Sequence, residues 1–352
     1  MFQIDELPIP ATLDGEGGAE FARAVDVGNE VEATSYGTAD LAYFADEELP
    51  EWRDPYAPHR LVVARVDGEI VGRASYETRT DEDTDTAWIG VLVLPDFEGR
   101  GIGRALADRI EAIAAAEGRT KLLAYTGVTG QGGDRLDSPT GFGSVPRDAR
   151  STRFLLARGY SLEQVERVSR LPLPVPSIEE RLAAALEASG PEYSIVTWVG
   201  ATPERWLPDI ANLATRMSTD APSAGLEEPE DPWTVQRVLD AEARTLDSPR
   251  TRIVAAARHE PTDSLAGYTV FSAPAQRARC VDQYATLVLR EHRGHRLGML
   301  LKVANLAHLQ EQRPGHPSVI TFNAEENRHM LDVNEALGFE AIASEGAWRK
   351  DL

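Results

Sequence analysis

The sequence predicts an α+β fold, an α/β sandwich of two tandem domains, each with a mixed, mostly antiparallel central sheet flanked by helices. Its 352 residues suit two domains of about 150 residues each. In each half a hairpin, an apolar strand, a glycine-rich turn and a helix follow one another, which indicates an internal duplication. Matching positions are 195 residues apart in the sequence: Gly72 and Gly267, Val93 and Val288, and Gly103 and Gly298.

The first copy shows these elements in chain order. Residues 60–77 predict two strands joined by an Asp-Gly turn. The apolar run 87–95 predicts the next strand, and the apolar spacing over 104–118 predicts the helix after the glycine turn. The Gly/Ser/Pro-rich segment 126–148 predicts a long loop, either a lid over a cleft or a non-catalytic insertion. The copy closes with Leu-Leu-Ala-Arg-Gly-Tyr, ending at Tyr160.

The second copy repeats the order. Residues 251–271 predict a hairpin with a longer loop, 283–291 a strand, and 299–312 a helix. It closes with Asn-Glu-Ala-Leu-Gly-Phe, ending at Phe339. Chance does not readily keep a hairpin, a strand and a glycine turn in one register, so we interpret the pattern as a duplication.

The join between the copies is also visible. Alternate prolines over 171–176 predict an extended segment, because proline fixes φ and disfavours helix in the residue before it. Ser177 and Glu180 then predict a capping box at the start of a short helix that Gly190 ends. The predicted division is an N-terminal domain (1–171), a linker with a short helix (172–192) and a C-terminal domain (193–352).

Composition excludes several classes of protein. The formal net charge of −21 argues against nucleic acid as a partner and permits a cationic acceptor, although such acidity also serves solubility alone. No apolar run approaches the roughly 18 residues that a membrane span needs, and the N-terminus lacks the pattern of a signal peptide. Cys280 is the one cysteine in the sequence, which excludes an intrachain disulfide and a Cys-rich zinc site. We expect a cytoplasmic protein without a metal, with Cys280 in the core.

The glycine turn in each copy predicts an anion site, because backbone N–H groups converge there at a helix N-terminus. A pyrophosphate suits such a turn. A P-loop is excluded because neither turn ends in Gly-Lys-Ser/Thr. A Rossmann fingerprint is disfavoured because the glycine spacing differs and the turn follows an antiparallel hairpin.

The strings Val-Leu-Pro-Asp-Phe-Glu-Gly-Arg-Gly-Ile-Gly (93–103) and Val-Leu-Arg-Glu-His-Arg-Gly-His-Arg-Leu-Gly (288–298) resemble the pyrophosphate motif of GNAT (Gcn5-related) acetyltransferases. With the hairpins and closing motifs, the resemblance covers nearly the whole chain. The second half is similar to the C-terminal domain of actinobacterial two-domain GNATs, a group that includes mycothiol synthase-like proteins. The resemblance implies an acyl-CoA-dependent N-acyltransferase with acetyl-CoA as co-substrate.

The resemblance also implies where CoA binds. Backbone groups of the strands and turns would hold the pantetheine arm and the pyrophosphate, and two asparagines lie where the family contacts CoA. These candidates are Val93, Arg100, Gly101, Gly103 and Arg104 in the first copy, and Leu287, Val288, Arg293, Gly294, His295, Arg296, Leu297, Gly298, Asn323 and Asn327 in the second. Two positions depart from the motif: Glu98 replaces the usual Gln or Arg, and Arg296 replaces a glycine, where we expect helical backbone. Asn327 equally suits a helix cap.

Only the second copy offers polar residues for catalysis on the strand before the turn. Strand side chains alternate, so Asp282, Tyr284 and Thr286 should share the face of Val288, whereas the matching face in the first copy is apolar. The resemblance implies that Asp282 is the general base, although a strand-end aspartate is also a common solvated cap. Tyr284 is a candidate acid or a packing residue.

The family's acidic tyrosine, five residues before the closing aromatic residue, is replaced by Asn334 here and by Leu155 in the first copy. An amide does not usefully protonate a thiolate, but Asn334 would hydrogen-bond the CoA sulfur or the pantetheine, with solvent supplying the proton. The segment 220–233 lies where the family builds its acceptor site. Its carboxylates suit a cationic acceptor or form a solvated loop: Asp220, Glu227, Glu228, Glu230 and Asp231.

The function expected from this sequence is transfer of an acetyl or short acyl group from CoA to a small-molecule primary amine. The chemistry would take place in the C-terminal domain by direct attack in a ternary complex. The alternative is a catalytically inactive acyl-CoA-binding regulator or sensor, which the missing tyrosine and the departures at Glu98 and Arg296 favour. We expect a monomer, since two fused copies would cover each other's sheet edges.

Overall fold

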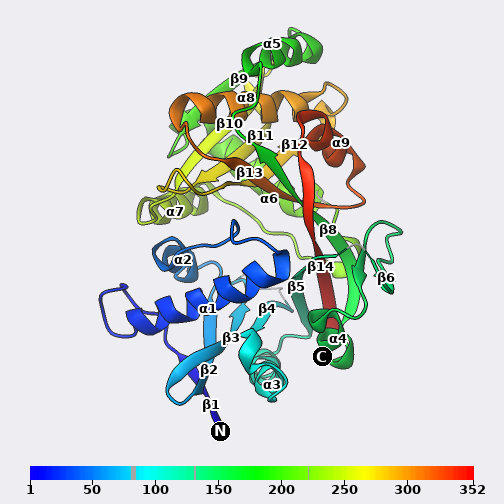
Figure 1. Ribbon diagram of the computed structural model, residues 1–352. Coiled ribbons are helices and arrows are strands. Elements are labelled where there is room, and N and C mark those ends of the chain that lie inside the picture. Colours follow the sequence, from blue (N-terminus) through cyan, green and yellow to red (C-terminus); the bar gives the residue numbers. More distant parts are fainter. Residues whose placement is uncertain (81–84, 131, 221) are drawn as a thin grey trace.

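A computed structural model describes residues 1–80, 85–130, 132–220 and 222–352. Within these residues, one sheet of twelve strands runs through both copies (Figure 1), in the order β1-β2-β3-β4-β5-β14-β8-β13-β12-β11-β10-β9. Helices flank it, which confirms the predicted fold class. Among the described residues, no helix combines the length and apolarity that crossing a bilayer requires.

The N-terminal copy contains the first eight strands. Its elements are β1 (Phe2–Leu7), α1 (Gly18–Tyr36), α2 (Ala45–Trp52), β2 (His59–Val66), β3 (Glu69–Glu77), β4 (Thr86–Val93), the 3-10 turn η1 (Pro95–Phe97), α3 (Ile102–Ala116), β5 (Lys121–Val128), β6 (Arg135–Asp137), β7 (Ser144–Pro146), α4 (Arg150–Ala157) and β8 (Ser161–Pro172). Phe21 of α1 is buried, and so are Ala24 and Val25, three and four residues after it, as expected for the core face of an amphipathic helix.

The C-terminal copy follows a connecting helix, α5 (Ile178–Ser189). Its elements are β9 (Tyr193–Val199), η2 (Glu204–Trp206), α6 (Leu207–Asp220), η3 (Ala224–Leu226), α7 (Val235–Leu246), β10 (Thr251–His259), β11 (Ser264–Ala273), β12 (Val281–Val288), η4 (Arg290–His292), α8 (Leu297–Gln312), β13 (Ser318–Ala324), α9 (Arg328–Leu337) and β14 (Glu340–Asp351).

The repeat is visible in the strand register. Gly72 pairs with Val93 across β3 and β4, and Gly267 pairs with Val288 across β11 and β12. A Cβ atom added to Gly267 would lie 2.5 Å from the carbonyl oxygen of Leu287. The close approach of the two strands therefore requires glycine there.

The last strand of each copy joins the sheet of the other copy. β8 pairs antiparallel with β13, and β14 pairs antiparallel with β5. Figure 1 shows β14, in red, leaving α9 and running down beside β5, while β8, in green, runs the opposite way. β8 and β14 also pair with each other. Strand pairing therefore crosses the predicted division at residue 171.

The join and the long loop differ in part from prediction. α5 begins and ends as predicted, but the capping box is wrong: Ser177 has φ 51° and its side chain makes no cap hydrogen bond. A hydroxyl caps from extended backbone, which a left-handed residue does not provide. Within segment 126–148, of which residue 131 lies outside the described residues, β6 and β7 form a short hairpin. Val145 in this hairpin is buried in the N-terminal core.

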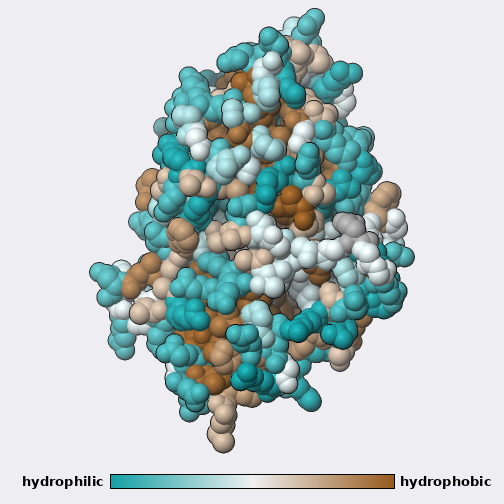
Figure 2. All heavy atoms as spheres, in the orientation of Figure 1, coloured by the Kyte–Doolittle hydropathy of each residue, from teal (hydrophilic) through white to brown (hydrophobic). Residues whose placement is uncertain are grey.

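The surface is mainly hydrophilic on the face that Figure 2 shows, with apolar side chains scattered over it. The apolar residues gather instead on both sides of the sheet, in one large cluster in the N-terminal copy and several smaller ones in the C-terminal copy. The two copies thus have cores of their own, which the shared sheet and two small clusters with residues of both copies connect.

Candidate active site

The site in the C-terminal copy begins where two parallel strands separate. β12 and β13 pair only from Val281 to Gln283, opposite Val319 to Thr321. Beyond Gln283, the edge of β12 that faces β13 has no strand partner among the described residues. The N-terminal copy has the same arrangement, since pairing of β4 with β5 stops at Ile89. Each copy therefore has an opening in its sheet beside the glycine turn.

A β-bulge distinguishes the two openings. Ala285 pairs with Val270 and Gln283 with Phe271, so Tyr284 is an extra residue on β12. In the N-terminal copy, β3 and β4 pair residue by residue without a shift. Bulges re-aim side chains and are common beside active sites.

The bulge makes one sequence prediction wrong. Asp282 and Tyr284 both contact the side chain of Tyr43, but Thr286 does not share their face. Its hydroxyl instead contacts Thr269, at 2.8 Å, and Gln283. The extra residue shifts the alternation of side chains by one position after Tyr284.

The turn of the C-terminal copy presents free backbone N–H groups. The first bond into α8 runs from the Leu300 amide to the Arg296 carbonyl, so the amides of Leu297, Gly298 and Met299 precede the intrahelical ladder. Gly294 has φ 90°. Arg296 has φ 55°, so the expectation that it stays helical is wrong. It takes the left-handed conformation that glycine has in the first copy, and its side chain is exposed.

The turn of the N-terminal copy has the same backbone with different charges around it. Gly99 and Gly101 have φ 72° and 85°, and the first bond into α3 is from Ala105 to Gly101. Glu98 forms an ion pair with Arg150 at the start of α4. The candidates Val93, Arg100, Gly101, Gly103 and Arg104 surround this turn, where Glu98 adds a negative charge beside the free amides.

The other candidates for CoA binding are divided between core and surface. Leu287 and Leu297 are buried, whereas Arg293, Gly294 and His295 are exposed. Arg293 donates to the carbonyl oxygen of Val288 at 3.2 Å, and its guanidinium contacts Asp220 at 3.2 Å. The backbone group expected to bind pantetheine therefore has a side-chain partner in this structure.

Asn334 contributes a buried polar atom without a partner. The residue is 1% exposed, and its Nδ2 donates to Asn323 Oδ1 at 2.7 Å. Its Oδ1 accepts no hydrogen bond from any residue that the structure describes. An orphaned carbonyl oxygen of this kind fits a ligand N–H such as those of a pantetheine arm. Asn327 is a helix cap, since its Oδ1 accepts from the Met330 amide at 3.4 Å. Leu155, at the matching position in the N-terminal copy, is buried in the core.

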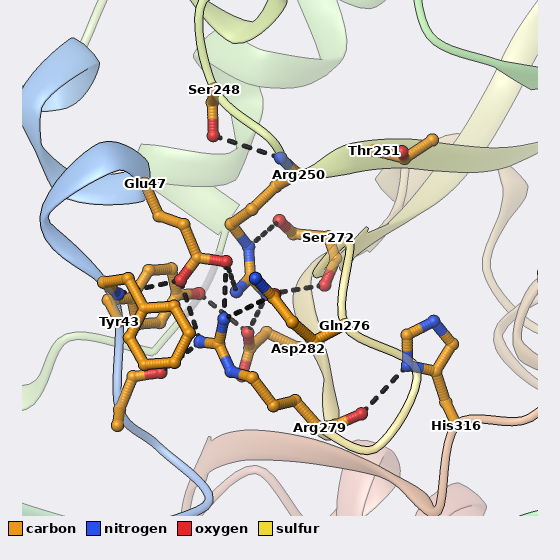
Figure 3. A network of polar contacts seen from close by, with 12 residues as sticks. Tyr43, Glu47, Ser248, Arg250, Thr251, Ser272, Gln276, Arg279, Asp282 and His316 are labelled. Atoms are coloured by element: carbon orange, nitrogen blue, oxygen red, sulfur yellow. Dashed lines mark hydrogen bonds and ion pairs between the residues drawn. The ribbon is translucent and has the colours of Figure 1, made fainter.

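Asp282 lies in a network that joins the two copies (Figure 3), where the phenol of Tyr43 donates to it at 2.8 Å. The same phenol oxygen lies 2.9 Å from the phenol oxygen of Tyr284. Arg250 donates to Asp282 and also contacts Glu47 of α2 at 3.3 Å. Arg279 contacts Glu47 at 2.7 Å.

Burial and charge act in opposite directions on the two carboxylates. Burial raises the pKa of Asp282 above its usual value, and the positive charge of Arg250 and the Tyr43 hydrogen bond only partly oppose it. Burial would also raise the pKa of Glu47, but hydrogen bonds from Arg279 and the Phe44 amide, with the charge of Arg250, lower it instead. Asp282 is therefore the more readily protonated of the two.

We expect Glu47→Gln to destabilise the protein by about 3–5 kcal/mol, because it leaves Arg279 without its counter-charge and Arg250 with Asp282 as its remaining one. The lowered pKa of Glu47 means that its carboxylate stabilises the fold above the ordinary value and loses this effect as the pH falls through the lowered one. Thermal denaturation at pH 7 should show a midpoint about 5 °C or more below wild type, and the gap should shrink in acid. Asp46→Asn, at an exposed position of the same helix, is the control, and equal midpoints for the two variants would contradict the assignment.

Sequence reasoning did not identify Tyr43, Glu47, Arg250 or Arg279. Each lies outside the glycine turns and closing motifs, and Tyr43 and Glu47 come from the other copy. They become apparent only from side-chain contacts between the two copies, and a repeat in the sequence does not show which residues make such contacts.

Cys280 is buried, with its Sγ 2.9 Å from Ser318 Oγ, and it lines a small cavity of about 170 Å³. The prediction of a core cysteine is confirmed. Burial raises the pKa of its thiol, which disfavours the reactive thiolate. Within the described ranges, no group of three or more His, Cys, Asp or Glu side chains is placed to hold a metal ion.

Most carboxylates of the acidic segment 220–233 contact other side chains. Residue 221 of this segment lies outside the described residues. Asp220 contacts Arg216, Arg290 and Arg293, and Asp231 contacts Arg237. The remaining contacts reach the N-terminal copy or the last strand: Glu228 accepts from Tyr125, and Glu227 pairs with Arg349. Because most of these carboxylates have partners, the segment offers less free negative charge to a cationic acceptor than its composition suggests.

Comparisons with known proteins agree with this fold. The model of the acetyltransferase (GNAT) family matches residues 29–135, whereas no curated protein matches the chain. A solved tandem GNAT protein from the clavulanic acid biosynthesis pathway is 25% identical, with a TM-score of 0.74, and the match covers 99% of this chain and 98% of that one. A GCN5-related N-acetyltransferase from Sphaerobacter thermophilus is 16% identical, with a TM-score of 0.60, and the match covers 99% of this chain and 95% of that one. A glucosamine N-acetyltransferase region of a fungal multi-domain β-N-acetylglucosaminidase is 14% identical, with a TM-score of 0.61, and the match covers 99% of this chain and 38% of that one. The last two similarities concern the fold alone.

Proposed function

Because the chain belongs to the acetyltransferase (GNAT) family as a tandem two-copy member, we propose that it moves an acetyl or short acyl group from acetyl-CoA to a small-molecule primary amine. We place the chemistry in the C-terminal copy, by direct attack in a ternary complex. The observation that carries this choice is the bulge at Tyr284, which lies where β12 leaves β13, two residues after Asp282, and has no counterpart on β4.

The C-terminal copy binds the co-substrate through its strand edge and turn. Val288 offers backbone groups to the pantetheine arm, once Arg293 releases its carbonyl, and Leu287 lies next to it on the same strand. The pyrophosphate is held by turn amides at the start of α8, aided by the helix dipole and by two exposed arginines. These groups are the amides of Gly294, His295, Leu297 and Gly298 and the side chains of Arg293 and Arg296.

The reaction forms a C–N bond, breaks the C–S bond of the thioester and removes a proton from the attacking ammonium. Asp282 takes this proton as general base. Asn334 Oδ1 accepts a hydrogen bond from the pantetheine and so fixes the thioester beside Tyr284. Since an amide has no acidic proton to give, solvent protonates the departing thiolate.

The N-terminal copy supplies no chemistry in this proposal. The residues of β4 beside its opening, Gly90 to Val93, carry no titratable side chain, and Leu155 replaces the tyrosine. Its turn still suits CoA through Val93, Arg100, Gly101, Gly103 and Arg104, against the charge of Glu98. We propose that the N-terminal copy spans residues 1–171, the linker 172–192 and the C-terminal copy 193–352. We also propose that the protein acts as a monomer.

Two observations favour the alternative of an inactive acyl-CoA-binding regulator. The carboxylate of Asp282 is ion-paired with Arg250, and Asn334 stands in place of an acid. Both functions require acyl-CoA at the turn, but only the enzyme consumes it.

The experiment that separates the two functions measures thiol release from acetyl-CoA in the presence of a panel of primary amines, from monoamines to polyamines and aminoglycosides. We expect amine-dependent release, with N-acetylated product identified by mass spectrometry. Calorimetry with acetyl-CoA on the full chain runs in parallel. Binding without turnover across the panel would support the regulator, and absence of binding would contradict both functions.

A further inference from the structure

The segment between the first two helices of each copy lies against the other copy. In the N-terminal copy this segment, residues 37–44, brings Tyr43 onto β12. In the C-terminal copy, the corresponding segment, residues 222–234, contacts β5: Tyr125 donates to Glu228, and Lys121 donates to the Glu227 carbonyl at 2.7 Å. Each opening therefore has one wall from the opposite copy.

Tyr43 is held firmly in its place. Asn29 of α1 contacts both backbone groups of Tyr43: its Nδ2 donates to the carbonyl at 2.6 Å and its Oδ1 accepts from the amide at 3.2 Å. The guanidinium of Arg250 lies 4.3 Å from the centre of the Tyr43 ring, a cation–π distance. Because both the backbone and the ring of Tyr43 are held by neighbouring side chains, its hydroxyl is kept at a defined position.

The hydroxyl lies between the two candidate catalytic side chains. It donates to Asp282 Oδ2 at 2.8 Å and lies 2.9 Å from the Tyr284 phenol oxygen. Tyr284 is 59% exposed at the opening, whereas the side chain of Asp282 is only 15% exposed. An acceptor amine thus meets Tyr284 first, and the carboxylate lies behind it.

From this placement, and on the basis of the proposed function, we infer that Tyr43 is a positioning residue of the C-terminal active site and relays the acceptor's proton from Tyr284 to Asp282. The ammonium gives a proton to the Tyr284 oxygen while the Tyr284 proton moves to Tyr43 and the Tyr43 proton moves to Asp282. Each phenol gives one proton and gains one, so the step ends with a neutral amine and a protonated Asp282. The active site then needs both copies.

The surroundings support this direction of transfer. Burial and the neighbouring Asp282 carboxylate raise the pKa of Tyr43, so the phenol remains protonated and able to donate at neutral pH. The charged groups facing this trio are Arg250 and Arg279 of the C-terminal copy and Glu47 and Glu51 of α2. The arginines favour the ionised form of Asp282, and Glu47 opposes it.

The test is Tyr43→Phe, which removes the hydroxyl and keeps the ring beneath Arg250. Its control is Tyr56→Phe, because the Tyr56 phenol also donates to a carboxylate of the other copy, Asp240, at 2.7 Å, but lies outside the catalytic trio. We expect kcat to fall at least about tenfold in Tyr43→Phe, with KM for acetyl-CoA and the thermal midpoint near wild type, and no change in Tyr56→Phe. The acidic limb of the pH profile of kcat should move to higher pH, because the lost hydrogen bond had lowered the pKa of Asp282.

A second measurement is independent of turnover. Carbon-13 NMR of aspartate carboxyls, with Asp282 assigned through Asp282→Asn, should show the Asp282 titration shifted upward in Tyr43→Phe and unshifted in Tyr56→Phe. An unchanged kcat and titration in Tyr43→Phe, or an equal loss of kcat in both variants, would overturn the relay alone. No turnover by wild type with any amine would overturn the proposed function together with it.

Discussion

Gly298→Glu is expected to lower acetyl-CoA-dependent turnover at least about a hundredfold, while Gly103→Glu leaves most of it. Gly298 lies in the first turn of α8, where free amides and the helix dipole attract a pyrophosphate. A carboxylate about 4 Å from a phosphate charge costs about 4 kcal/mol at an effective dielectric constant of 20, which corresponds to roughly a thousandfold in affinity. Steady-state kinetics and calorimetry with acetyl-CoA on both full-length variants measure the effect.

The two glycines form a matched pair because the fold tolerates a side chain at both. A Cβ on Gly298 would lie 3.9 Å from Val333, and one on Gly103 would lie 3.7 Å from Phe154, both ordinary van der Waals distances. Neither residue has positive φ, unlike Gly101 and Gly294. The variants should therefore keep the thermal midpoint of wild type. Loss of turnover in Gly103→Glu with retention in Gly298→Glu would show that the N-terminal copy is the active one.

Asp282→Asn should lower kcat at neutral pH by about 10²–10⁴-fold, the contribution typical of a positioned base. The affinity for acetyl-CoA should remain near wild type, because the base acts on the amine. In wild type, kcat falls as the pH drops through the pKa of Asp282, which burial raises above 3.8. This acidic limb should disappear in the variant.

The control for this substitution is Asp240→Asn, since Asp240 also accepts a phenol hydrogen bond from the other copy. Asparagine keeps an acceptor for Tyr43 and Arg250, so calorimetry and thermal denaturation report whether the fold and the CoA site survive. A pH–rate profile in Asp282→Asn that matches wild type would remove Asp282 from the mechanism, whatever the size of the change in kcat.

The repeat made much of the fold predictable. Positions 195 residues apart, such as Val93 and Val288, have the same place at the end of a strand in both copies. The register is predictable because local side-chain patterns specify hairpins and turns. The partner of a closing strand is not specified in this way, because β8 and β14 pair with strands far away in the sequence, which tertiary packing selects.

The site was less predictable for two local reasons. A bulge adds one residue to a strand, and the alternation of apolar residues does not mark where it occurs. The change in side-chain direction after Tyr284 therefore could not be predicted from the sequence. Arg296 looks helical by its position, yet it takes φ 55°, because the turn requires left-handed backbone there even at the cost of about 1 kcal/mol for a residue with a Cβ. Asn334, which the closing motif alone singled out, lies on the last helix, α9.

The exchange of closing strands has a consequence for synthesis on the ribosome. Among the described residues, the edge of β5 opposite β4 pairs only with Glu340–Asp351, more than 200 residues later. The N-terminal sheet therefore remains open along that edge while the C-terminal copy is being translated. Such an edge is a template for pairing with other chains, and translation at about 5–20 residues per second leaves it exposed for roughly ten seconds or more. The N-terminal copy therefore completes its sheet only after the C-terminal copy has been translated and β14 has paired with β5.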